Sequence, residues 1–136
     1  MRICLSVLLF CGAIFADTLC DISFDNGLKL PSVPLADTDE KRRKGLSNRD
    51  DVGNGMLFSW REPTSVGFWM KDTKVALDIG FFGKDKKLFQ IDRMEPLSLD
   101  SHPSDKPILL ALELKRSGFS DNNLTVGVKV TALNCQ

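Results

Sequence analysis

Four side chains with the chemistry to bind or transform a small molecule lie in two apolar stretches of the sequence. They are Trp69, Lys71, Asp78 and Glu113. Because successive residues of a strand alternate between its two faces, Trp69 and Lys71 share one face of an extended segment. Asp78 and Glu113 each lie between apolar neighbours, so each faces either solvent or a shared polar pocket. An aromatic platform, a cation and two carboxylates together suit a small polar ligand such as a sugar or a peptide fragment.

The same four residues allow two other interpretations. Asp78 and Glu113 are a candidate acid–base pair for cleaving a saccharide or a peptide, because glycosidases use two carboxylates in this way. Alternatively, Lys71 forms an ion pair with Asp78 or Glu113 across neighbouring strands and Trp69 belongs to the core. The domain is then a structural or protein-interaction module. The sequence leaves open whether the protein is an enzyme and places ligand binding ahead of catalysis.

Other catalytic arrangements are missing from the sequence. The single histidine, His102, lies in a loop rich in Pro, Ser and Asp, and one histidine does not make a metal site. No glycine-rich phosphate loop is present, so neither a metal nor a cofactor is expected. The 18 basic and 18 acidic residues balance, which argues against a nucleic-acid partner. The basic run at 41–44 is typical of the last turn of a short solvated helix.

The N-terminal residues predict export. Met1 and Arg2 precede an apolar run that ends at Phe15, and the small residue Ala16 follows it, which is the pattern of a signal peptide. The run is shorter than the roughly 20 apolar residues of a membrane anchor. Cleavage after Ala16 leaves a single domain, residues 17–136, with no stable membrane insertion. The predicted location is the periplasm or the extracellular space.

Cys20 and Cys135 are the two cysteines of the predicted mature chain. In an oxidising compartment an even pair is most simply a disulfide, and this one would join the two ends of the domain. A redox-active or metal-binding pair is the alternative, although neither cysteine has a second thiol or a histidine near it in the sequence. The triplet that begins at Asn123 (Asn-Leu-Thr) makes this residue a candidate for N-glycosylation.

The hydrophobic pattern predicts a mostly β domain with one short helix. Strands are expected at residues 28–36, 65–73, 77–82, 87–94, 108–114 and 126–130. The first contains two prolines and is expected at a sheet edge, whereas 108–114 is expected to be central. The helix is expected over 38–45, with Asp37 and Glu40 as a capping box and Gly45 as its stop. Five or six short strands around one core predict a compact antiparallel, barrel-like β fold.

Four ordered blocks make the sequence similar to the family called domain of unknown function 192. The blocks are Lys44-Gly45-Leu46, Gly55-Met56-Leu57-Phe58, Phe68-Trp69-Met70-Lys71-Asp72-Thr73 with Leu77-Asp78-Ile79, and Leu110-Ala111-Leu112-Glu113-Leu114. The resemblance runs from about residue 34 to residue 130. It implies a β-rich, barrel-like fold with a short helix, in bacterial and archaeal proteins that are commonly exported or membrane-tethered. It implies no reaction, because none is established for the family.

Two departures from the family pattern bear on the ligand. The family usually has Met where this chain has Ser47, and Asn where it has Asp72. A ligand shared by the family would therefore contact a binding site of different polarity in this chain.

The sequence as a whole favours an exported, non-enzymatic module that binds a small polar ligand or an envelope protein. The alternatives are a hydrolase of envelope saccharide or peptide, and a structural domain.

Overall fold

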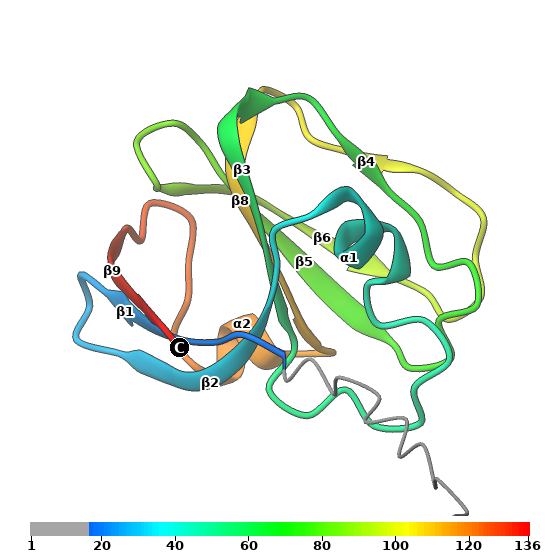
Figure 1. Ribbon diagram of the computed structural model, residues 1–136. Coiled ribbons are helices and arrows are strands. Elements are labelled where there is room, and N and C mark those ends of the chain that lie inside the picture. The colour runs from blue at the N-terminus through cyan, green and yellow to red at the C-terminus, as the bar shows by residue number, and fades with distance from the viewer. Residues whose placement is uncertain (1–16) are drawn as a thin grey trace, which may run out of the picture.

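Residues 17–136, which the computed structural model describes, form nine strands and two short helices (Figure 1). The strands are β1 (Leu19–Phe24), β2 (Lys29–Ala36), β3 (Met56–Thr64), β4 (Gly67–Phe68), β5 (Leu77–Phe82), β6 (Leu88–Met94), β7 (His102–Pro103), β8 (Ile108–Lys115) and β9 (Val130–Cys135). The helices are α1 (Asp39–Lys44) and α2 (Gly118–Asp121). The predicted signal peptide, residues 1–16, lies outside the described residues.

Seven strands form one curled sheet in the order β6-β5-β8-β3-β2-β1-β9, and β4 pairs with β7 in a separate ribbon. The two ends of the curled sheet approach each other. The amide of Leu88 donates a hydrogen bond to the carbonyl of Val128 (2.8 Å), and the amide of Val130 donates to the carbonyl of Lys86 (3.0 Å). The expected mostly β, barrel-like fold with a short helix is confirmed.

Alternation along β8 divides the core into two apolar clusters. Leu110, Leu112 and Leu114 pack into a first cluster with residues of β1, β2 and α2. Ala111 packs into a second cluster with residues of β3 and β5 and with residues on either side of α1. This is the period of two that a strand imposes on its side chains. Glu113 shares the face of Ala111, so the sheet directs a carboxyl group into the second cluster.

A disulfide joins Cys20 in β1 to Cys135 in β9, as the sequence predicted. The two cysteines are direct partners in the antiparallel β1–β9 register. The sulfur of Cys20 lies within the first cluster, because this residue is completely buried. The bridge therefore fastens the first strand of the described chain to the last.

Within residues 17–136 no helix is long and apolar enough to cross a bilayer.

The predicted place of residues 28–36 at a sheet edge is wrong, because β2 lies between β1 and β3. Its pairing with β3 is parallel and involves only Leu35 and Ala36. Pro31 and Pro34 precede this pairing, so their missing amides interrupt no ladder on that side. One parallel pair thus enters a sheet that the sequence predicted to be wholly antiparallel.

The helix and the last strand begin at different residues from those predicted. Thr38 caps α1 in place of Asp37, because its hydroxyl accepts a hydrogen bond from the amide of Lys41 (3.2 Å). The last strand begins at Val130 because the chain before it turns at Gly127, whose φ is +101°. The second helix, α2, was not expected from the sequence.

Candidate functional site

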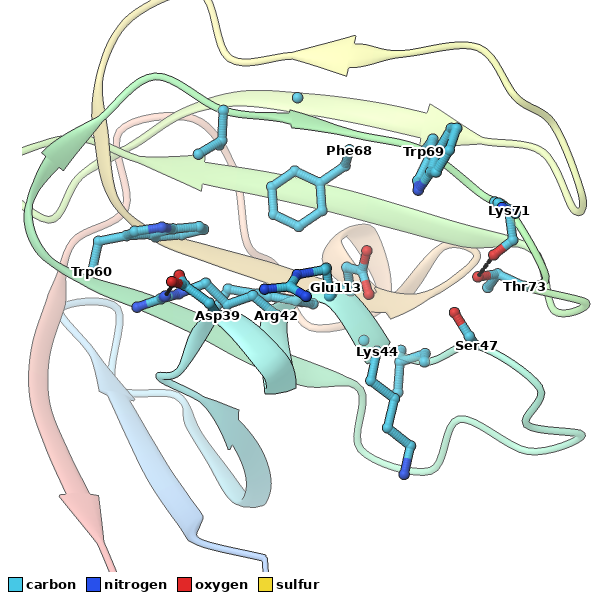
Figure 2. Close-up of a pocket in the computed structure, with 16 residues that line it drawn as sticks. Asp39, Arg42, Lys44, Ser47, Trp60, Phe68, Trp69, Lys71, Thr73 and Glu113 are labelled. Atoms are coloured by element: carbon cyan, nitrogen blue, oxygen red, sulfur yellow. Dashed lines mark hydrogen bonds and ion pairs between the residues drawn. The ribbon is translucent and has the colours of Figure 1, made fainter.

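The sheet register places Glu113 at the base of a cavity. Glu113 in β8 lies between Met56 of β3 and Ile79 of β5, and both of these neighbours are buried and apolar. The cavity measures about 330 Å³, which is within the range of small-molecule sites. Figure 2 shows the Glu113 carboxyl pointing into the space between Phe68 and α1.

The side chains around the cavity come from α1 and its C-terminal turn, from β3, and from the segment 66–73. The lining residues are Asp39, Arg42, Arg43, Lys44, Gly45, Leu46, Ser47, Phe58, Trp60, Val66, Gly67, Phe68, Trp69, Lys71, Thr73 and Glu113. Several are charged or aromatic, and both tryptophans of the protein are among them. The cavity therefore combines apolar walls with a polar rim, as ligand sites commonly do.

The Glu113 carboxyl has no polar partner among residues 17–136. Its side chain is 5 % exposed, and no described donor makes a hydrogen bond or an ion pair with it. Burial away from water penalises the charged form, which raises the pKa of Glu113 from 4.5 to about 8. At neutral pH the group is therefore mostly a neutral carboxylic acid that can donate one hydrogen bond and accept others.

Aromatic rings form one wall of the cavity. Phe68 packs edge-on against Phe58, with ring centroids 5.0 Å apart, and against Trp60 at 6.4 Å. These edge-to-face contacts fix the orientation of the rings. Trp69 follows Phe68 in sequence and is 55 % exposed, so it is available at the mouth of the cavity. The alternative in which Trp69 belongs to the core is wrong.

Two cations lie over the tryptophan rings. The Arg42 guanidinium is 5.1 Å from the Trp60 centroid, and the Lys71 ammonium is 5.4 Å from that of Trp69. Arg42 is also held by Asp39, whose Oδ1 accepts from Nη1 at 2.9 Å, and by the carbonyl of Ser59. Lys71 makes no ion pair within the described chain, so its charge remains available to a ligand.

A tight turn holds the 69–73 segment over the cavity. The amide of Thr73 donates to the carbonyl of Met70 (3.1 Å), and Met70 is completely buried beneath the turn. Asp72 has a φ of +56°, in the left-handed region where Asn and Asp are enriched. Strand β4 consequently ends at Phe68, and the predicted strand over 65–73 is wrong beyond that point. Trp69 and Lys71 still come together, through the turn.

Comparisons with known proteins agree with this architecture. Residues 22–132 match the family DUF192, which is described as an uncharacterized ACR. The chain belongs to this family. The DUF192 resemblance expected from the four sequence blocks is thereby confirmed. No curated protein matches the chain.

Two solved structures resemble this DUF192 chain. One is a protein of unknown function from Novosphingobium aromaticivorans DSM 12444, with 28% identity, a TM-score of 0.74 and 84% of each chain covered. The other is described as a "putative transcription regulator" from Sinorhizobium meliloti 1021, with 27% identity and a TM-score of 0.74. That match covers 88% of this chain and 94% of the other.

Three of the four site residues predicted from the sequence meet in the cavity of this DUF192 domain, and the fourth does not. Trp69, Lys71 and Glu113 all line it. Asp78 pairs in register with Leu114, the residue after Glu113, so the two carboxyl groups point to opposite faces of the sheet. Asp78 is instead bound by Arg116 (Nε–Oδ1 3.0 Å) and by the amide of Ser117 (2.9 Å to Oδ2). The predicted pair of Asp78 and Glu113 is not formed.

Three further lining residues could not be linked to the site from the sequence alone. Trp60, Phe68 and Arg42 lie in separate elements and converge only through packing. Ser47 also lines the cavity and adds a polar group to its rim. The predicted modification site Asn123 is far from these residues in the chain and is exposed. Within residues 17–136 no cluster of three metal-ligating side chains occurs.

Gly55 sets the position of Glu113, and we expect Gly55→Ala to destabilise the protein. A Cβ at Gly55 would collide with the backbone carbonyl oxygen of Glu113, and the residue has a φ of +83°. The expected loss in free energy of unfolding is on the order of 2 kcal/mol or more, measured by urea denaturation. Gly53→Ala is the matched control, because Gly53 also has a positive φ (+50°) but nothing lies near its Cβ position. Equal losses in the two variants would contradict this role of Gly55.

Proposed function

We propose that this protein is an exported, non-enzymatic binding module that holds a small polar ligand in the cavity over Glu113. The observation that carries the proposal is the Glu113 carboxyl, which is buried, points into the cavity and has no hydrogen-bonding partner among the described residues. Within residues 17–136 no fully buried side-chain polar atom lacks a hydrogen-bond partner, so the Glu113 oxygens, which have none, are reached from the cavity. Since polar groups in folded proteins are nearly always paired, a ligand in the cavity is a suitable partner for them. Export is supported by the predicted signal peptide and by the Cys20–Cys135 disulfide.

The cavity supports binding better than hydrolysis. The hydrolytic alternative required two cooperating carboxylates, and Asp78 is turned away and held by Arg116. The other carboxylate in the lining, Asp39, is paired with Arg42. A general acid without a second group to activate water or attack the substrate lacks half of the machinery of a glycosidase.

Ligand screening by thermal unfolding tests the proposal. The protein, purified with its disulfide intact, is screened against sugars, sugar acids, amino acids and short peptides. A ligand at one hundred times its dissociation constant should add about 2.7 kcal/mol to the stability of the folded state. For a domain of this size that corresponds to a rise in Tm of roughly 8–13 °C. The intrinsic fluorescence gives a second readout, because the protein has two tryptophans and no tyrosine and both tryptophans line the cavity.

Trp69→Ala should abolish the shift without unfolding the protein, because this side chain is already largely exposed. Leu99→Ala is the matched control, since Leu99 is 66 % exposed and does not line the cavity. A shift that survives in Trp69→Ala would place the ligand elsewhere. No rise in Tm with any ligand class would count against a binding role for the cavity.

A further inference from the structure

The charges around the cavity narrow the chemistry of its ligand. We propose that the cavity binds a hydroxylated organic acid of hexuronate size, with its carboxylate at the basic rim and its hydroxyl groups facing Glu113. This inference rests on the proposed function and deepens it by naming the ligand class. A free hexuronate and a hexuronate unit of a saccharide present the same chemistry, so both belong to the class.

The rim carries an excess of positive charge. Apart from Glu113, the titratable lining residues are four bases, Arg42, Arg43, Lys44 and Lys71, and one acid, Asp39. Asp39 is paired with Arg42, whereas Arg43 and Lys71 make no ion pair within residues 17–136. Figure 2 shows the ammonium of Lys44 directed away from the cavity, so Arg43 and Lys71 are the bases best suited to a bound anion. A carboxylate held there would form charge-assisted hydrogen bonds.

The aromatic wall argues against a cationic ligand. Aromatic rings attract cations through their faces, so a cavity with two tryptophans and a glutamate would otherwise suit an amine. Here, however, the protein's own cations already lie over these rings, Arg42 over Trp60 and Lys71 over Trp69. An incoming ammonium group would meet like charge at both sites. The apolar face of a sugar ring can instead pack against Phe68.

The base of the cavity suits a hydroxyl group. Glu113 lies beside the apolar Met56 and Ile79, and no basic side chain among the described residues pairs with it. Burial keeps its pKa near 8, so at neutral pH it offers one O–H donor and an acceptor oxygen. A hydroxyl group of a ligand can use both at once. The rim and the base therefore recognise different parts of one molecule.

Calorimetric titration with four related saccharides tests this inference. Galacturonate, galactose and galactosamine share one ring and differ in charge, and trigalacturonate carries the same unit in a chain. At pH 6, where galactosamine is cationic and Glu113 is protonated, galacturonate should bind at least about tenfold more tightly than galactose. Galactosamine should bind more weakly than galactose. Tighter binding of galacturonate than of trigalacturonate, or the reverse, supports the inference in either case. Which of the two binds more tightly indicates whether the natural ligand is a free hexuronate or a unit of a saccharide.

Charge-removing variants locate the carboxylate. Lys71→Met and Arg43→Met should each weaken galacturonate binding about fivefold or more relative to galactose binding in the same variant. Lys84→Met is the matched control, because Lys84 is exposed and does not line this cavity. Binding of galactose or galactosamine in preference to galacturonate would overturn the inference and leave the binding proposal standing. Failure of all four saccharides while another class of ligand binds and is lost in Trp69→Ala would also overturn the inference alone. Failure of every ligand class would overturn both.

Discussion

Replacing Glu113 with Gln should remove a steep dependence of stability on pH. In the wild-type protein the pKa of Glu113 is raised from 4.5 in the unfolded chain to about 8 in the folded one. Between these values the folded state binds more protons than the unfolded state, so stability falls as the pH rises. The slope is about 1.4 kcal/mol per pH unit, which amounts to at most about 4 kcal/mol between pH 5 and pH 8. The contribution is fully present below pH 4.5.

Urea denaturation at several pH values measures this effect as the difference between wild type and Glu113→Gln. The amide cannot ionise, so the variant should be more stable than wild type at pH 8 and comparable with it at pH 5. Glu62→Gln is the control, because Glu62 is exposed and its replacement should leave the pH dependence unchanged. Parallel pH profiles for wild type and Glu113→Gln would show that Glu113 does not stay protonated in the cavity.

Removing the Cys20–Cys135 disulfide should cost about 4–5 kcal/mol of stability, because the bridge closes a loop of more than 100 residues in the unfolded chain. The double variant Cys20→Ala, Cys135→Ala should therefore unfold at a much lower urea concentration than the oxidised wild type. This is the largest single stabilising contribution that we expect in the domain.

Dithiothreitol separates the covalent effect from the change in packing at Cys20. The reductant should lower the stability of the wild type to near that of the double variant and should leave the double variant itself unchanged. If reduction of the wild type changes its stability by less than 1 kcal/mol, the first and last strands are held together mainly by the β1–β9 ladder.

Much of the fold could be predicted because its central strands carry strong local signals. The apolar run at residues 108–114 is the central strand β8, and the alternation at 77–82 is β5. Prediction failed where tertiary pairing overrides local pattern. The valines at 126 and 128 alternate like a strand, yet strand β9 begins only at Val130, after the turn at Gly127. The parallel contact of β2 with β3 joins segments whose pairing no local signal specifies.

The site could be predicted only in part, because strand register is not a local property. Glu113, Trp69 and Lys71 were recognisable from their residue types and apolar flanks. The face on which Asp78 lies depends on its alignment with β8, and a shift of one residue reverses that face. The approach of α1 to β3, which brings Arg42 over Trp60, likewise depends on packing between distant segments. Sequence patterns therefore identified which side chains could act in the site, but not which of them lie next to one another.

The pairing of β1 with β9 has a consequence for the order in which the chain can fold. Cys20 and Cys135 are 115 residues apart, so the ladder between them cannot form until almost the whole polypeptide is present. Folds dominated by such distant pairings form slowly, since the entropy of loop closure must be overcome first. A chain exported from its N-terminus would thus complete its sheet only after its C-terminus had emerged.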